Sequence, residues 1–92
     1  MLEDNTILIR NNEILATEME GETVMMSVEN GEYYSLSPIG TRIWEILKNK
    51  MNFKQLVEKL MQEYDVDYNT CKEDTAEFVN ELIKKKLVIL KG

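Results

Sequence analysis

Side chains able to carry out acid–base or nucleophilic chemistry are few in this chain, and their spacing is poor. The sequence contains no histidine, which excludes Ser–His and Cys–His nucleophile pairs and any histidine metal site. Carboxylates are plentiful, but they fall in predicted turns, as Glu20 and Glu22 do, or on predicted solvent-exposed helix faces, as Glu73, Asp74 and Glu77 do. That pattern is typical of a solvated acidic surface. We therefore predict a protein that is not an enzyme and that binds no metal.

Other reactive or cofactor-binding features are equally weak. The single cysteine, Cys71, opens a predicted helix, but this position alone is weak evidence for a reactive thiol. It has no partner for an internal disulfide, which fits a reducing compartment. The four glycines do not form a phosphate-binding loop; they are Gly21, Gly31, Gly40 and Gly92. No cofactor is predicted.

Composition indicates one small, acidic domain that spans residues 1–92. Hydrophobic residues make up 43% of the chain, enough for a single modest core. The net charge of −6 repels phosphate backbones, so nucleic-acid binding is not expected, whereas a basic peptide would be tolerated. No apolar run is long enough to span a membrane, and the N-terminus does not resemble a signal peptide. We expect a cytoplasmic protein that does not bind membranes.

The first half of the chain predicts a three-stranded antiparallel meander. Residues 13–19 form its first strand, and their alternation favours Leu15 and Met19 on the buried face. Asn30-Gly31 predicts a two-residue type I′ turn between strands at 23–29 and 32–36. Residues 6–10 are expected to form a short extended segment before the sheet.

The second half predicts three helices. Ser37 caps the first, with Pro38 at its first position. Asn52 and Gln55 have the spacing of a capping box ahead of a strongly amphipathic helix that reaches Tyr64. Thr70 with Glu73 predicts the start of the third helix, which ends in the lysines of residues 84–86. Residues 87–90 are too short and too β-branched for more helix, and we expect an extended tail that packs on the core or closes the sheet.

The strand at 32–36 has a partner on one side only, which leaves its other edge open. It contains no proline or lysine to discourage further pairing. Tyr33 and Tyr34 point to opposite faces, so that one packs inward while the other can line a groove. The open edge also makes strand exchange between chains plausible, and the expected state is a monomer or a weak strand-exchanged dimer.

The sequence resembles the PqqD-type proteins, the peptide-recognition domains of pathways that modify ribosomally made peptides. The blocks that carry the resemblance are Gly-x-Tyr-Tyr-x-Leu at 31–36 and Ile-Gly-x-Arg-Ile-Trp at 39–44, followed by two helices and Leu87-Val88. The likeness covers about residues 13–90. The run Met-Glu-Gly-Glu-Thr-Val-Met-Met at 19–26 is most similar to versions from lasso-peptide pathways. The chain departs from the family at Lys86, where many members have glycine.

The resemblance implies an α+β fold in which a three-stranded antiparallel sheet is followed by three helices in a winged-helix-turn-helix-like arrangement. It implies that the leader of a precursor peptide adds as a further strand to the sheet and lies against the third helix. The strand wall and the helix wall are then formed by Glu32, Tyr33, Tyr34, Ser35, Leu36, Phe78, Val79, Leu82, Lys85 and Lys86.

The function predicted from this resemblance is that of a non-catalytic adaptor. It holds the leader and delivers the precursor peptide to a partner enzyme, either a leader protease in a lasso pathway or a radical-SAM enzyme. The alternative is a winged-helix DNA-binding regulator. The acidic start of the third helix, with Glu73, Asp74 and Glu77, argues against a recognition helix. A small enzyme with an acidic site is the least favoured of the three.

Overall fold

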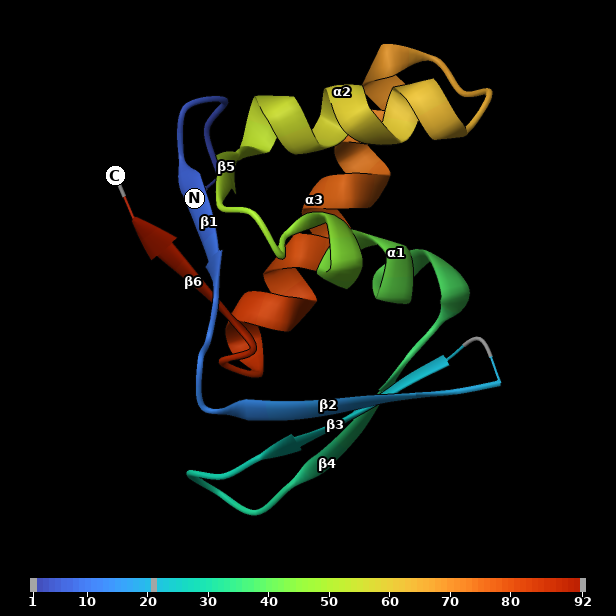
Figure 1. Cartoon of the computed structure of the whole chain (residues 1–92). Coiled ribbons are helices and arrows are strands. Elements are labelled where there is room, and N and C mark those ends of the chain that lie inside the picture. The colour runs from blue at the N-terminus through green and yellow to red at the C-terminus, as the bar shows by residue number, and fades with distance from the viewer. Residues whose placement is uncertain (1, 21, 92) are drawn as a thin grey trace.

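The computed structural model describes residues 2–20 and 22–91, and this part of the chain folds into two small antiparallel sheets and three helices (Figure 1). The elements in chain order are β1 (Ile7–Arg10), β2 (Ile14–Met19), β3 (Glu22–Ser27), β4 (Tyr33–Leu36), α1 (Pro38–Ile46), β5 (Met51–Asn52), α2 (Phe53–Glu63), α3 (Tyr68–Lys84) and β6 (Val88–Lys91). The predicted α+β class, with a three-stranded antiparallel sheet followed by three helices, is confirmed.

The meander forms one layer beneath the helices in Figure 1, with strands in the order β2-β3-β4. Its register places Leu15 opposite Met26 and Met26 opposite Tyr33. The row beside it joins Ala16, Met25 and Tyr34 on the opposite face. In the described chain β4 pairs only with β3, so its second edge is open.

A second sheet, in the order β5-β1-β6, lies beside the helices. The predicted extended segment and the predicted tail are its two longer strands, paired from Ile7 opposite Lys91 to Arg10 opposite Val88. The tail therefore does not extend the meander. It pairs with β1 instead, and this pairing ties the end of the chain to its beginning.

The turn between β3 and β4 differs from the predicted two-residue type I′ turn. Its loop comprises residues 28–31, and the N–H of Ser27 donates to the carbonyl oxygen of Glu32 at 2.9 Å. Gly31 has φ +71°, whereas Asn30 is not in the left-handed region that a type I′ turn requires at both central positions. The longer loop is favoured by the Asn30 side chain, which accepts from Glu32 N at 2.9 Å.

Two of the three predicted helix caps are confirmed. Ser37 Oγ accepts from the N–H of Gly40 at 3.2 Å, and Asn52 with Gln55 forms the complete capping box, with bonds of 2.8 and 2.9 Å. The predicted start of the third helix at Thr70 is wrong. The helix begins two residues earlier, at Tyr68, with Asp67 at the N-cap position, and Tyr68 packs against the core.

The core lies between the helices and the inner face of the meander. Its fully buried side chains come from both sheets and all three helices and include Leu8, Met25, Ile43, Phe53 and Val79. The prediction that Leu15 and Met19 are buried is wrong, because each is 59% exposed. The helices cover the face that carries Met25, and the register turns Leu15 outward with its cross-strand neighbour Met26.

Candidate functional site

The open edge of β4 presents main-chain hydrogen-bonding groups to solvent. Opposite residues in an antiparallel pair alternate between hydrogen-bonded and non-hydrogen-bonded pairs. Since Ser27 and Glu32 form a hydrogen-bonded pair, Tyr33 and Ser35 occupy the non-bonded positions. Their N–H and C=O groups therefore face away from β3. The edge offers two donors and two acceptors to an added strand.

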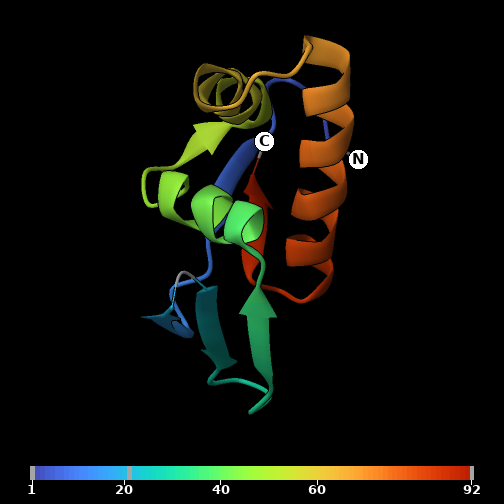
Figure 2. The same cartoon turned by 90° about the vertical axis from the view of Figure 1, so that its right-hand side faces the viewer.

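A groove runs between this edge and α3. Its lining comes from the end of β4, the start of α1 and one face of α3 and comprises Ser35, Leu36, Ser37, Gly40, Phe78, Glu81, Leu82 and Lys85. In Figure 2 the head of the β4 arrow lies near the C-terminal end of α3, and the rest of the strand extends below the helix. Gly40 lets α1 approach β4 closely, because an added Cβ there would lie 3.4 Å from the Cβ of Leu36. The groove thus has a main-chain wall on the β4 side and a helix wall in which apolar Phe78 and Leu82 lie beside charged Glu81 and Lys85.

Tyr34 joins the two walls at one end of the groove. Its ring lies 5.4 Å from Nζ of Lys85, a cation–π distance, and its hydroxyl donates to Glu32 Oε2 at 2.7 Å. The hydrogen bond to Glu32 raises the pKa of Tyr34 above its ordinary value, since it holds the proton on the phenol.

Five of the ten residues predicted from the sequence line this groove, namely Ser35, Leu36, Phe78, Leu82 and Lys85. On β4, the main-chain groups of Tyr33 and Ser35 face the open edge. The side chains of Tyr34 and Leu36 lie on the face of the sheet that packs against the core. From α3, Phe78 and Lys85 are partly exposed in the groove wall, and Leu82 lines it although it is 3% exposed.

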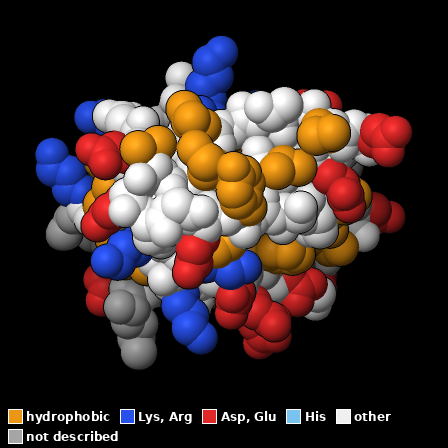
Figure 3. All heavy atoms as spheres, turned by 90° about the horizontal axis from the view of Figure 1, so that it is seen from below, with side chains coloured by type: hydrophobic (Ala, Val, Ile, Leu, Met, Phe, Trp, Pro, Cys, Tyr) orange, Lys and Arg blue, Asp and Glu red, His pale blue; other side chains and the backbone are white. Residues whose placement is uncertain are grey.

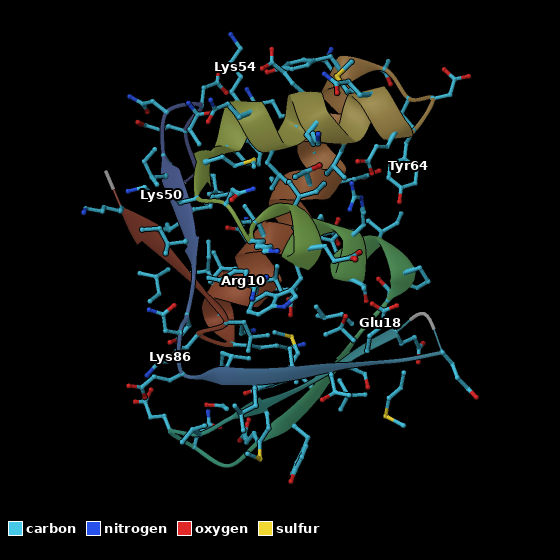
Figure 4. The ribbon with its side chains drawn as sticks, viewed as in Figure 1. Arg10, Glu18, Lys50, Lys54, Tyr64 and Lys86 are labelled. Atoms are coloured by element: carbon cyan, nitrogen blue, oxygen red, sulfur yellow. The ribbon has the colours of Figure 1, made fainter. Side chains whose placement is uncertain are left out.

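Five predicted residues lie outside the lining: Glu32, Tyr33 and Tyr34 precede it on the β4 side, and Val79 and Lys86 lie away from it on the α3 side. Val79 is completely buried beneath the helix wall. Lys86 is exposed in the turn from α3 to β6, near the junction of β1 and β2 (Figure 4), where its carbonyl oxygen accepts from Asn11 Nδ2 at 2.8 Å.

The groove continues past Phe78 into an apolar pocket that sequence reasoning missed. Its lining is drawn from all three helices and comprises Ile39, Ile43, Leu60, Tyr64, Val66, Cys71, Asp74, Thr75 and Phe78. Figure 4 shows Tyr64 at the end of α2, on the side of α1. One signal was available: Asp74, Phe78, Glu81 and Lys85 recur at spacings of four, three and four, and such spacings fall on one helix face.

The outer face of the meander is a separate apolar surface. Its side chains are Leu15, Met19, Val24, Met26, Val28 and Tyr33, of which Tyr33 is the most exposed at 71%. Figure 3 looks onto this side of the molecule and shows apolar side chains gathered across it, with charged side chains around them. Patches of this kind often mark contact surfaces for other proteins.

Residues 2–20 and 22–91 contain no group of three or more cysteine, aspartate or glutamate side chains that could hold a metal ion. Within the same residues no helix is both long and apolar enough to cross a membrane. What the described residues do offer is a groove, an apolar pocket and the main-chain hydrogen-bonding groups of the β4 edge.

Comparisons with known proteins relate both the sequence and the fold to one group. The sequence profile of the family described as coenzyme PQQ synthesis protein D (PqqD) matches residues 22–88. No curated protein matches the chain by sequence.

Two solved structures share the fold. One is described as TbiB1 in complex with the TbiA(beta) leader peptide; it is 26% identical, with a TM-score of 0.80 over 87% of this chain and 93% of that chain. The other is described as lasso peptide synthetase B1 complexed with the leader peptide; it is 20% identical, with a TM-score of 0.74 over 89% of this chain and 96% of that one. At this identity the second structure supports the fold alone.

Proposed function

Since the chain belongs to the family of coenzyme PQQ synthesis protein D, we propose that it binds the leader segment of a ribosomally made precursor peptide and has no catalytic activity of its own. The observation that carries the proposal is the open edge of β4, where the main-chain groups of Tyr33 and Ser35 face a groove walled by α3. A protein of similar fold, TbiB1, is described in complex with a leader peptide.

The proposed mode of binding is strand addition. An extended leader pairs with Tyr33 and Ser35 through up to four main-chain hydrogen bonds, each contributing roughly 0.5–1.5 kcal/mol. Its side chains alternate between the groove and solvent, so every second residue meets Phe78, Leu82 or the aliphatic stem of Lys85. Main-chain bonds then give affinity and the apolar wall gives register.

The proposed site includes Glu32, Tyr33, Tyr34, Ser35 and Leu36 on the strand side. On the helix side Phe78, Leu82 and Lys85 contact the peptide. Val79 supports this wall from beneath, and Lys86 forms the turn that ends it. The apolar pocket beyond Phe78 accepts a bulky side chain from the leader.

We further propose that the outer face of the meander docks a partner enzyme, a leader protease or a radical-SAM enzyme. An added leader strand would extend the same sheet, so that a protein seated on Leu15, Met26 and Tyr33 would also contact the outward side chains of the leader. This places the peptide against the enzyme without any chemistry by the adaptor. We propose that residues 1–92 act as one leader-binding domain in the cytoplasm, where precursor peptides are made.

No observation favours the DNA-binding alternative. The face of α3 that a winged-helix protein would direct to DNA carries Asp74, Glu77 and Glu81 along its groove side, and these carboxylates repel phosphates.

The experiment is a titration of isotope-labelled protein with the leader peptide of the precursor gene nearest to the gene of this protein. Amide shifts concentrated on residues 32–36 and 78–85 are expected. Saturable shifts elsewhere would retain the adaptor and reject this groove, and the lack of any response at high micromolar peptide would reject leader binding. The variant Leu15→Lys is expected to bind the leader normally and to lose the partner enzyme.

A further inference from the structure

The groove has an ordered distribution of charge along α3. One depression on the helix surface is lined by Asp74, Glu77, Phe78 and Glu81, so three of its four residues are acidic. The adjoining part of the groove, between Glu81 and Tyr34, contains the only groove-lining cation of the described chain, Lys85. The two ends of the groove therefore differ in the sign of their charge.

These carboxylates are not neutralised within the described residues. The two salt bridges there join Arg42 to Glu63 and Lys72 to Asp4, both away from the groove. Lys85 is directed toward the ring of Tyr34 rather than to Glu81. A peptide that enters the groove meets three unpaired negative charges at one end.

The direction of β4 relates these charges to the direction of the peptide. β4 begins with Tyr33 and Tyr34, and the ring of Tyr34 lies 5.4 Å from Nζ of Lys85. The strand ends at Leu36, which lines the groove with Phe78 and Glu81. Each pairing within the meander is antiparallel. A strand added antiparallel to β4 has its N-terminal end beside Phe78 and the three carboxylates.

We propose that the leader recognised by this protein carries lysine or arginine immediately N-terminal to the stretch that pairs with β4. This inference rests on the proposed leader binding and adds the chemistry of the peptide. The apolar wall and the β4 edge hold the strand, and the row Asp74, Glu77 and Glu81 selects its charge and direction. Complementary charges at the edge of a binding site speed the association of peptide and protein, and they disfavour binding of the peptide in the reversed orientation.

The test uses a synthetic, fluorescein-labelled leader of the nearest precursor gene and measures its dissociation constant by anisotropy. Glu81→Lys is expected to weaken binding about tenfold at low salt, because attraction becomes repulsion. Its matched control is Glu73→Lys, which makes the same charge change on an exposed residue of α3 outside the groove and is expected to alter affinity less than about twofold. The difference should vanish near 1 M salt, where the Debye length is about 3 Å.

A second peptide gives the reciprocal measurement. Replacing its lysines or arginines N-terminal to the paired stretch by glutamate should weaken binding to the wild type and restore part of the binding to Glu81→Lys. A nitroxide at the leader N-terminus should broaden the amide signal of Phe78 more than that of Lys85.

The charge inference would be overturned by equal effects of Glu81→Lys and Glu73→Lys. Tight binding of a leader that lacks the basic residues, or stronger broadening at Lys85 than at Phe78, would overturn it as well. Each of these outcomes would leave leader binding intact. Failure of the wild type to bind its leader would overturn the proposed function, and the charge inference with it.

Discussion

Nζ of Lys85 lies 5.4 Å from the centroid of the Tyr34 ring, and this contact links the end of α3 to the edge strand β4. Tyr34 is in turn hydrogen-bonded to Glu32. The three side chains keep the two groove walls together at the end opposite the apolar pocket, so a peptide strand must fit between walls already in place. A preformed groove lowers the ordering cost of binding, which then falls mainly on the peptide.

The Glu32 contact makes the ionisation of Tyr34 a measure of this arrangement. The hydrogen bond to Glu32, followed by partial burial, raises the pKa of Tyr34 above its ordinary value of 10.0. Because the folded-state pKa is raised, the stabilising contribution is fully present below the unfolded-state pKa and is lost as the pH rises through the folded-state pKa. Glu32→Gln is expected to lower the pKa of Tyr34 in a tyrosinate absorbance titration, with Tyr34→Phe to assign the transition. An unchanged titration would contradict the contact.

The open edge of β4 predicts a selective effect of proline. Ser35→Pro removes a donor that faces the edge and leaves the β3 ladder intact, because Ser35 occupies a non-hydrogen-bonded position. Leader affinity should fall about tenfold or more, since a hydrogen bond is lost and the ring obstructs the edge. Anisotropy with labelled leader measures the change.

Two controls accompany the proline variant. Ser35→Ala keeps the N–H and should bind within about twofold of the wild type. Ala16→Pro places proline on the open edge of β2 and should also bind normally. If both proline variants lost affinity equally while remaining folded, the leader would not be adding specifically to β4.

Phe78 is expected to be the main apolar anchor of the groove, because it lines all three depressions along α3. Phe78→Ala should weaken leader binding by about 1.5–3 kcal/mol, tenfold or more in the dissociation constant. Leu82 is a poorer site for this test, because it is almost fully buried and its truncation would also destabilise the core. The control is Ile89→Ala, an exposed apolar residue of β6; equal affinity losses in both folded variants would remove Phe78 from the site.

The salt bridge between Arg42 and Glu63 predicts a small loss of stability in acid. Arg42 Nε donates to Glu63 Oε1 at 2.7 Å, and this bond lowers the pKa of Glu63 below 4.5. The lowered folded-state pKa gives a stabilisation present above the unfolded-state pKa and lost as the pH falls through the folded-state value. Solvent screens this exposed pair, so Glu63→Gln should cost at most about 1 kcal/mol near neutral pH. Urea unfolding at neutral and acidic pH measures it, and the cost should be smaller in acid.

Much of the fold could be predicted from the sequence, because local signals coincide with the tertiary structure. Ser37-Pro38 and the pair Asn52 and Gln55 identify helix starts by hydrogen bonds that span only three residues. The outward face of β2 could not be predicted, because Leu15 and Met19 read as core residues. Their exposure depends on which face of the meander the helices cover.

The site was predictable only in part for a similar reason. The open edge at Tyr33 and Ser35 follows from the order of the strands, and α3 was expected to face it. The apolar pocket was not predicted, because Ile39, Leu60 and Phe78 belong to three different helices. Their convergence depends on helix packing, and no local pattern contains it. Val79 was predicted to line the groove but is completely buried. It lies in the same helix turn as Phe78, and the sequence does not show which residue of that turn faces the groove.

Lys86 has φ +61°, a left-handed conformation that is costly for a residue with a Cβ. It ends α3 in a Schellman motif, in which Lys86 N donates to Ile83 O at 2.9 Å and Leu87 N to Leu82 O at 2.8 Å. Glycine suits this position without strain. Lys86→Gly is therefore expected to stabilise the protein by about 1 kcal/mol, raising the melting temperature by roughly 4–8 °C.

Thermal unfolding followed by circular dichroism measures the effect. The control Lys86→Ala removes the same charge but retains a Cβ, and it should give no such gain. If Lys86→Ala and Lys86→Gly stabilised the protein equally, the gain would come from removal of the lysine charge and not from relief of the strained left-handed backbone. Because Lys86 lies outside the groove lining, leader affinity should be the same in all three proteins. A glycine variant that gained stability but lost affinity would instead make the end of α3 part of the peptide site.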